Sequence, residues 1–189
     1  GNQAETVEGR SIPLGADYLD YTIYEPIGVS AQIIPWNYPI EMTARGIAAA
    51  LATGNTCVVK TPELVPLSAT WLSRAGEAAG LPNGALNILC GYGHEAGAAL
   101  SSHLDIGNVV FTGSVATGIK VATAAAQNVV PAILELGGKS AAIVMPDADL
   151  DQVMASMRWG IFFNAGQVCS AMSRVIAHPD VHDEIVERA

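Results

Sequence analysis

The chain has 189 residues, with 9 lysines and arginines against 18 aspartates and glutamates, and its formal net charge is −9 at pH 7. So acidic a chain lacks the clustered cations that hold a phosphate backbone, which argues against nucleic acid as a partner. Half of the residues are hydrophobic, which argues against disorder, yet no apolar run approaches the ~18 residues of a membrane span, so no membrane partner is expected.

Only 14% of the residues are charged, against roughly 25% in an ordinary soluble domain. This deficit indicates that more chain or a partner subunit covers part of the surface. The three cysteines form no CxxC pair, and the start Gly1–Glu5 has neither the basic segment nor the apolar core of a signal peptide. A reduced, cytoplasmic location is the simplest interpretation.

Two extended segments with partial alternation of apolar residues, 12–14 and 18–24, lie within the first 25 residues. A segment this short cannot bury its own apolar side, so it must pack on something else. Two interpretations stay open. One is a strand packed on another part of its own domain, and the other is an oligomerisation or bridging arm formed by residues 1–25.

From Pro26 to Glu135, strand patterns alternate with helix patterns, which requires crossover connections and predicts a parallel sheet. Strand runs such as Val109-Val110-Phe111 are apolar on both faces, so helices are expected on both sides. We therefore predict a doubly wound α/β domain over residues 26–135, with ligands at the carboxyl ends of its strands. The expected strands are 28–34, 56–60, 86–90, 108–111 and 132–136, and the expected helices are 43–52, 67–79, one ending near 102 and one ending near 127.

The pattern changes at Leu136, where Gly137-Gly138 follows the last of these strands. Residues 136–189 are predicted to begin a second α/β domain that the chain does not complete. Its expected elements are strands at 141–145 and 173–178, a helix from a cap at Asp147 to about Phe163, and a last helix from Pro179.

Asp147, Asp149 and Asp151 alternate in the manner of a calcium-binding loop. That loop requires a glycine at the position of Gln152 and a glutamate at the position of Arg158, so the pattern fails. No metal site is predicted, and the aspartates are interpreted as caps of the following helix.

Two glycine-containing turns connect strands to helices and are candidates for holding a diphosphate. Gly91–Gly97 has the pattern GxGxxxG, and Phe111–Ser114 places the N–H groups of a helix N-terminus after a strand. Lys60 and Glu63 follow another strand, where the ordinary interpretation is exposed charge. An acidic side chain at such a position also binds an adenosine ribose and repels a 2′-phosphate, which favours NAD over NADP.

The three cysteines differ in their surroundings. Cys57 and Cys90 lie in apolar strand runs and are interpreted as inert core residues. Cys169 instead follows the polar, glycine-containing segment Asn164–Gln167. A loop cysteine acts as a nucleophile where its thiolate is accessible and stabilised, so Cys169 is a candidate catalytic residue.

Six motifs, taken together and in order, resemble the NAD(P)-dependent aldehyde dehydrogenase superfamily. They extend over nearly the whole chain, and each alone is a weaker signal. The motifs are Ile34–Pro39, Ala50–Thr56, Lys60–Glu63, Phe111–Ser114, Glu135–Ser140 and Phe163–Cys169.

The resemblance implies oxidation of an aldehyde to a carboxylic acid through a cysteine thiohemiacetal and a thioester. Cys169 would attack the aldehyde carbonyl, and the hydride would pass to the nicotinamide. The Asn37 side-chain amide and the Cys169 backbone N–H would stabilise the oxyanion. Glu135 would be the general base that activates water to hydrolyse the thioester.

The resemblance also implies a cofactor, NAD with NADP possible, and assigns its contacts. The adenosine ribose would be held by Lys60 and Glu63. The remaining contacts would be Gly93, Gly113 and Ser114 along the adenine and diphosphate path, Ile34, Pro35 and Trp36 on the nicotinamide side, and Leu136 and Gly137 beside the nicotinamide.

Family members are much longer than this chain, which therefore looks like an internal slice of the enzyme. Residues 26–135 would be a Rossmann-like NAD-binding domain without its N-terminal part, and residues 136–189 the start of the catalytic domain without its C-terminal part. The whole protein would act on a small-molecule aldehyde as a homo-oligomer, dimer or tetramer. Gly46 and Ala49 depart from the family, because many members carry a lysine, linked to a proton path, and a proline there.

Two alternatives stay open. One is a CoA-acylating aldehyde dehydrogenase, in which CoA replaces water, although the presence of Glu135 favours water. The other concerns the 189-residue chain alone, which would be a catalytically inactive nucleotide-binding or structural fragment.

Overall fold

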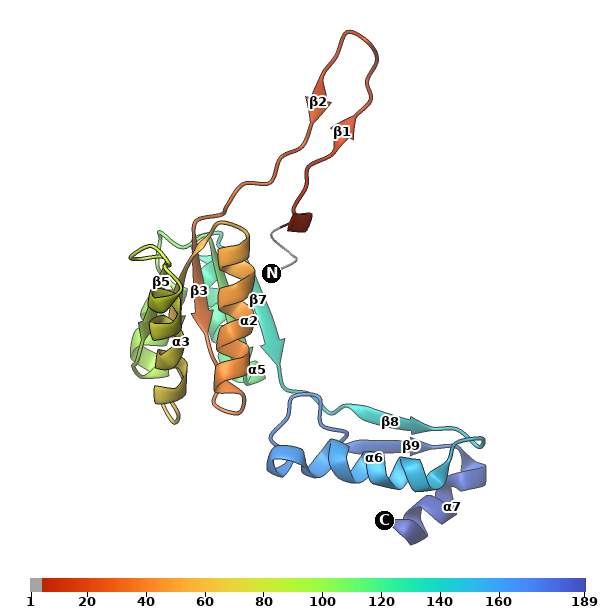
Figure 1. Ribbon diagram of the computed structural model, residues 1–189. Coiled ribbons are helices and arrows are strands. Elements are labelled where there is room, and N and C mark those ends of the chain that lie inside the picture. The colour runs from red at the N-terminus through yellow and green to blue at the C-terminus, as the bar shows by residue number, and fades with distance from the viewer. Residues whose placement is uncertain (1–4) are drawn as a thin grey trace. The chain divides into compact units, whose positions relative to one another are not determined.

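A five-stranded parallel sheet is the centre of the unit that ends at Glu135 in the computed structural model, which describes residues 5–189 (Figure 1). Its order is β5-β4-β3-β6-β7. The strands are β3 (Val29–Ile33), β4 (Thr56–Lys60), β5 (Leu86–Leu89), β6 (Asn108–Gly113) and β7 (Ala132–Leu136). The prediction of a doubly wound α/β fold is confirmed.

The strand order reverses beside β3, which makes its carboxyl end the place where ligands bind in such sheets. β3 pairs in parallel with β4 on one side and with β6 on the other. Ile33 is opposite both Lys60 and Phe111, so β3 and β4 end at the same level and β6 continues two residues further, to Gly113. The segments that follow these strands therefore share one edge of the sheet.

Helices connect the strands. α2 (Pro39–Ala52) and α3 (Leu67–Ala78) pack on each other, and so do α4 (Ala98–Ser101) and α5 (Val115–Ala126). Right-handed crossovers in this strand order place the first pair on one face and the second on the other. In Figure 1, α2 and α3 are drawn in front of the sheet. The helix predicted to follow Gly91–Gly93 and to end near 102 forms as the π-helix η1 (Gly93–Gly97) followed by α4.

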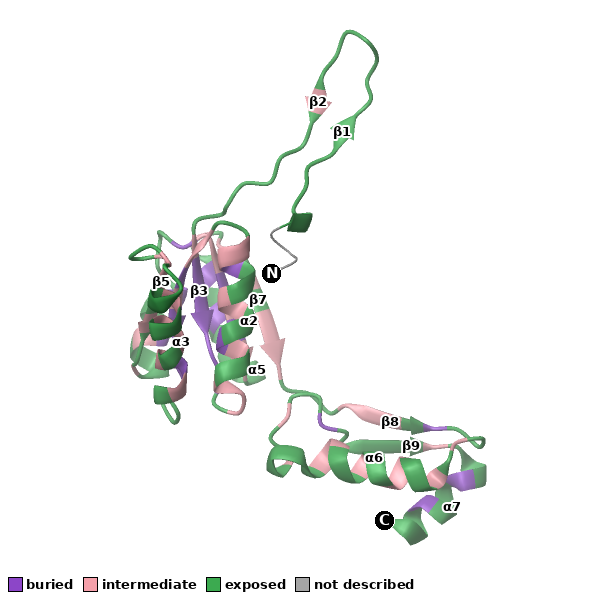
Figure 2. Cartoon of the chain, viewed as in Figure 1, coloured by how far each residue is buried: buried purple, intermediate pink, exposed green. Residues whose placement is uncertain are grey.

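The core of this unit lies on the three central strands, as the purple segments of Figure 2 show. Ala31, Val59 and Val109 are completely buried, one from each of β3, β4 and β6. The edge strand β5 alternates between half-buried and exposed residues. Burial is thus greatest in the strands whose ends adjoin the reversal of strand order.

An antiparallel pair, β1 (Ser11–Ile12) and β2 (Asp20–Tyr21), precedes the sheet. Its large apolar side chains Ile12 and Tyr21 are exposed, and so are Tyr18, Leu19 and Tyr24 beside β2. Exposed apolar side chains are expected both for a strand that packs on another part of its domain and for an oligomerisation or bridging arm. The role of residues 1–25 therefore stays a prediction. Residues 1–4 lie outside the described part of the chain, so the prediction about the segment Gly1–Glu5 falls largely outside it.

The second unit, Leu136–Ala189, has a parallel two-stranded sheet of β8 (Ala141–Val144) and β9 (Arg174–Ala177). Its small core contains Val144, Val181 and Ile185. Its helices are α6 (Leu150–Phe162), the 3-10 helix η2 (Phe163–Gly166) and α7 (Pro179–Arg188).

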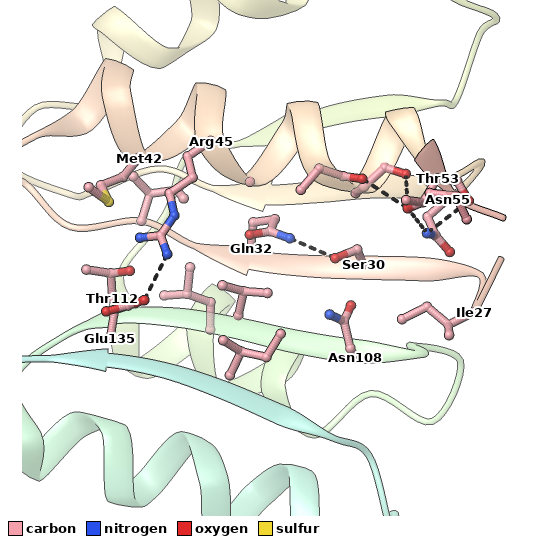
Figure 3. A pocket seen from close by; sticks show the side chains of 18 of the residues that line it. Ile27, Ser30, Gln32, Met42, Arg45, Thr53, Asn55, Asn108, Thr112 and Glu135 are labelled. Carbon is pink, nitrogen blue, oxygen red and sulfur yellow. Dashed lines mark hydrogen bonds and ion pairs between the residues drawn. The ribbon is translucent and has the colours of Figure 1, made fainter. Parts of the chain in front are cut away.

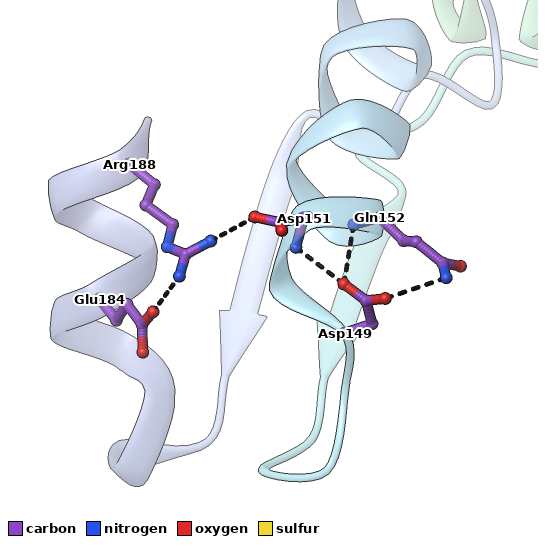
Figure 4. Close-up of polar contacts among 5 residues, drawn as sticks. All are labelled: Asp149, Asp151, Gln152, Glu184 and Arg188. Atoms are coloured by element: carbon purple, nitrogen blue, oxygen red, sulfur yellow. Dashed lines mark hydrogen bonds and ion pairs between the residues drawn. The ribbon is translucent and has the colours of Figure 1, made fainter.

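A polar network joins α7 to the start of α6 (Figure 4). Arg188 Nη1 donates to Asp151 Oδ1 at 2.7 Å, and Nη2 donates to Glu184. The hydrogen bond to Glu184 is the main cause of the raised pKa of Arg188. The network adds to the small apolar core in holding α7 in place.

The prediction that Asp147 caps α6 was wrong. The cap is Asp149, whose Oδ1 accepts hydrogen bonds from the backbone N–H groups of Asp151 at 3.0 Å and Gln152 at 3.2 Å. The reason is position, because an N-cap side chain must stand directly before the first helical residue, here Leu150.

The prediction that Cys90 is a core residue was also wrong. Cys57 is buried in β4, and burial raises the pKa of its thiol to about 11. Cys90 is exposed, because β5 is an edge strand that ends at Leu89. Sheet position, rather than local hydropathy, separates the two residues.

Candidate active site

Ile34–Asn37 follows β3 and leads directly into α2. Ile34 is buried, and its backbone N–H donates to the Lys60 carbonyl oxygen at 3.1 Å, which extends the pairing of β3 with β4 by one residue. Pro39 then fits the first turn of α2, where no backbone N–H is needed. Pro35, Trp36 and Asn37 are thereby held between a buried strand end and a helix start.

Lys60 and Glu63 lie at the end of β4 and differ in their environment. Lys60 is only 5% exposed, and desolvation lowers the pKa of its ammonium group, an effect that the nearby Glu63 opposes. Glu63 is exposed, and its Oε2 accepts a hydrogen bond from the Gly93 N–H at 2.9 Å. The structure therefore brings together the strand end and the first glycine of η1, two of the predicted cofactor contacts.

Gly113 and Ser114 form the turn from β6 into α5. A side chain at position 113 would come within 2.5 Å of the Phe111 ring, so the turn requires glycine. Ser114 caps α5 by accepting a hydrogen bond from the Thr117 N–H at 3.2 Å. The N–H groups of Val115 and Ala116, in the first helical turn, have no partner within the helix and suit an anion.

Glu135 lies on β7 and forms an ion pair with Arg45 of α2, with Nη2 and Oε1 2.9 Å apart (Figure 3). Both side chains line a pocket of about 560 Å³ between α2 and the strands β3, β6 and β7. Sequence reasoning identified Glu135 but missed Arg45. The available signal was a single cation within segment 44–50, whose other residues are small or apolar.

In the second unit, Cys169 is exposed on the loop between η2 and β9. Three successive residues before it, Asn164, Ala165 and Gly166, have left-handed backbone conformations. The first two are not glycines, and such conformations persist only where the surrounding structure enforces them. The Gln167 N–H donates to the Asn164 carbonyl at 3.0 Å and closes this turn.

The same loop is fastened to α6. The Met172 N–H donates to the Gly160 carbonyl at 3.0 Å, and a side chain at position 160 would come within 2.8 Å of the Met172 sulfur, so the methionine would have to move. Trp159 and Phe163, with ring centroids 4.9 Å apart, line an apolar pocket of about 480 Å³ together with Val168 and Ser170, the neighbours of Cys169. An accessible thiol thus lies beside an apolar, partly aromatic wall.

Leu136 ends β7, and Gly137 and Gly138 follow it. Within the second unit, a side chain at position 138 would lie 3.8 Å from the Cys169 carbonyl oxygen, so the glycine segment runs beside the Cys169 backbone. Asn37 and Glu135 belong to the first unit, whereas Cys169 belongs to the second. The convergence of these three groups stays a prediction.

Comparison with known proteins decides the family. The family model described as "Aldehyde dehydrogenase family" matches residues 1–189. The chain belongs to the aldehyde dehydrogenase family. The resemblance drawn from the six motifs is thereby confirmed.

Relatives in this family share close to half of their residues with the chain. Aldehyde dehydrogenase family 2 member B4, mitochondrial, from Arabidopsis thaliana is 48% identical over 98% of the chain and 35% of its own length. Benzaldehyde dehydrogenase, mitochondrial, from Antirrhinum majus is 47% identical over the same shares. The NAD⁺ complex of the aldehyde dehydrogenase from Bacillus cereus superposes with a TM-score of 0.94 at 44% identity, covering 97% of this chain and 38% of that one.

The chain therefore spans little more than a third of the length of these aldehyde dehydrogenases. The two plant relatives carry mitochondrial names, and the cytoplasmic location of this protein stays a prediction. Among residues 5–189, no helix is long and apolar enough to cross a membrane, and no group of three or more His, Cys, Asp or Glu is arranged to hold a metal.

Proposed function

We propose that the protein to which this chain belongs oxidises an aldehyde to a carboxylic acid with NAD, using Cys169 as the nucleophile. The observation that carries the proposal is an exposed thiol on a loop with an enforced left-handed turn, in a chain of the aldehyde dehydrogenase family. The solved Bacillus cereus relative in complex with NAD⁺ supports the choice of cofactor.

The strand ends of the first unit fit a dinucleotide. The turn at Gly113 leaves no room for a side chain, and the helix behind it offers N–H groups to a diphosphate. Glu63 holds the Gly93 N–H and has a second oxygen available for a ribose hydroxyl. A carboxylate at this place also repels a 2′-phosphate, so we propose NAD as the preferred cofactor over NADP.

Each candidate residue has a distinct task in the reaction. The Cys169 thiolate forms a bond to the aldehyde carbon, and the oxygen that gains charge is stabilised by the Asn37 amide and the Cys169 N–H. NAD, when bound, supplies the acceptor for the hydride that leaves this carbon. Glu135 then takes a proton from water as the water oxygen attacks the thioester, and the carbon–sulfur bond breaks to release the acid.

Cysteine replacement in the full-length protein tests this proposal. Cys169→Ala removes the nucleophile, so aldehyde-dependent NADH formation should fall by at least about 10³-fold. Cys90→Ser is the matched control, since it alters another exposed thiol, and it should keep wild-type turnover. Undiminished turnover of Cys169→Ala would contradict the proposal.

Release of the acyl group to CoA is the alternative outcome, and a different measurement separates it. Glu135 provides a general base, which CoA, itself a thiol nucleophile, needs less than water does. We therefore expect free carboxylic acid as the product at an unchanged rate whether or not CoA is added. A product that appears only as an acyl-CoA would favour the alternative.

The isolated chain of 189 residues should show no turnover, because it holds little more than a third of an aldehyde dehydrogenase. Calorimetric titration with NAD distinguishes a nucleotide-binding fragment from a purely structural one. Robust turnover by the isolated chain would contradict the expectation.

A further inference from the structure

The ion pair between Arg45 and Glu135 joins two residues 90 positions apart in the chain, one on a helix and one on an edge strand of the sheet. Figure 3 shows the guanidinium reaching from α2 past Thr112 to the carboxylate. Met42, Arg45 and Gly46, from one face of α2, line the pocket beneath it. The arginine is therefore directed toward the pocket by its place on the helix.

Arg45 and Glu135 are the only charged side chains among the described residues that line this pocket. The other lining residues are apolar or neutral, such as Gln32, Asn108 and Thr112. Glu135 has no alternative cation in this lining, so the orientation of its carboxylate depends on Arg45.

The contact uses one carboxylate oxygen. Arg45 Nη2 donates to Oε1, and Oε2 makes no hydrogen bond within the described part of the chain. A single donor on one oxygen restricts the rotation of the carboxylate and leaves the lone pairs of the other oxygen available. This is the arrangement that a general base needs when it accepts a proton from water.

We propose that Arg45 is a positioning residue that holds Glu135 Oε1, so that Oε2 is presented to the water that hydrolyses the thioester. The inference rests on the proposed function, in which Glu135 is the general base. Oε2 accepts one proton from water, the water oxygen bonds to the thioester carbon, and the electron pair of the broken carbon–sulfur bond returns to Cys169 as thiolate. The proton then passes from Glu135 to the thiolate or to solvent.

A purely structural role for Arg45 would be minor, because the pair is solvent-exposed, at 60% for Arg45 and 46% for Glu135. Exposed pairs contribute little to stability. The variant Arg45→Ala should therefore fold, and its defect should appear in one kinetic step alone.

Deacylation of the full-length protein isolates that step. p-Nitrophenyl acetate acylates a reactive thiolate without NAD, and the excess reagent is then removed. Loss of the acetyl group from Cys169 is followed by intact mass and peptide mapping. Arg45→Ala should keep the initial burst of p-nitrophenolate but slow deacylation by about 10-fold or more, while Glu135→Gln slows it by about 10²-fold or more.

Three further variants separate positioning from a general charge effect. Arg45→Ala/Glu135→Gln should be no slower than Glu135→Gln alone, because both changes remove the same function. Arg45→Lys should recover most of the rate lost in Arg45→Ala, since it restores a donor. Arg74→Ala is the matched control, because it removes an exposed helical arginine that stacks on Trp71, and it should deacylate at the wild-type rate.

Wild-type deacylation in Arg45→Ala, or effects of Arg45→Ala and Glu135→Gln that multiply in the double variant, would overturn the inference while leaving the proposed function intact. Failure of the wild-type protein to acylate Cys169, or wild-type deacylation in Glu135→Gln, would instead overturn the proposed function and the inference with it. The two failures are therefore distinguishable.

Discussion

In the first unit, Ile34, Lys60 and Gly113 lie at the ends of strands that contain completely buried side chains, whereas in the second unit Cys169 lies on a loop beside a helix that buries no residue. Ile34 directly follows β3 and Lys60 is the last residue of β4, so the sheet determines where their backbones lie. Cys169 depends on a left-handed turn and on a few backbone hydrogen bonds of its loop, among them those from Ala171 to Val168 and from Met172 to Gly160.

The two units differ in how far their own elements support the candidate site residues. The strands β3, β4 and β6 are covered by helices of the same unit, so the cofactor-side residues are supported locally. In α6, the large side chains Trp159 and Phe162 are exposed. We therefore expect the thiol side of the site to depend on additional packing partners more than the cofactor side does.

The largest expected effect concerns Asn37, the candidate oxyanion donor of the first unit. In the full-length protein, Asn37→Ala should lower kcat by about 10²–10³-fold, because one of two oxyanion donors is lost. KM should change little, since the donor acts mainly on charge that develops during reaction. Steady-state kinetics check this expectation, and a change confined to KM would contradict it.

A smaller effect compares the packing of the two units directly. Val59 is completely buried in β4, so Val59→Ala leaves a cavity and should lower the free energy of unfolding by about 2–3 kcal/mol. Val175 of β9 is partly exposed, and Val175→Ala should cost less than about 1 kcal/mol. Urea unfolding of the isolated chain measures both, and equal losses would break the comparison.

The smallest effect depends on pH and on Cys57. Its pKa is raised by burial from 9.0 to about 11 in the folded chain, so only the unfolded chain ionises between these values. Stability that is fully present below pH 9 should therefore decrease as the pH rises toward 11, by about 1 kcal/mol between pH 9 and 10. Cys57→Ala should lose that part of the pH dependence, and an unchanged slope would contradict the assignment.

Sequence patterns predicted the strands well where tertiary packing agrees with local hydropathy. The segment 132–136 was expected as a strand, and β7 has the same bounds. Cys90 shows the limit, because an apolar run does not reveal whether its strand lies at the edge of the sheet. Asp147 shows another limit, because each of three alternating aspartates is a possible N-cap. The sequence does not show that α6 starts at Leu150, which makes Asp149 the cap.

Sequence alone can nominate those candidate site residues that lie within recognisable motifs. Glu135, Asn37 and Cys169 follow from family-matching segments, and the contact of Glu63 with Gly93 agrees with their shared assignment to the cofactor. Arg45 could not be paired with Glu135 from sequence, because the fold alone brings residues 90 positions apart together. The burial of Lys60 was likewise hidden, since a charged residue at the end of a strand usually indicates exposure.

The central claim is that Cys169 carries the acyl group during aldehyde oxidation. Full-length Glu135→Gln, mixed with an aldehyde and NAD, quenched and mapped by peptide mass spectrometry, tests it most directly. We expect one NADH for each acyl group formed, with that group on the peptide containing Cys169 and not on Cys57 or Cys90. NADH formation with no acyl group on Cys169, or with the acyl group on Cys90, would contradict it.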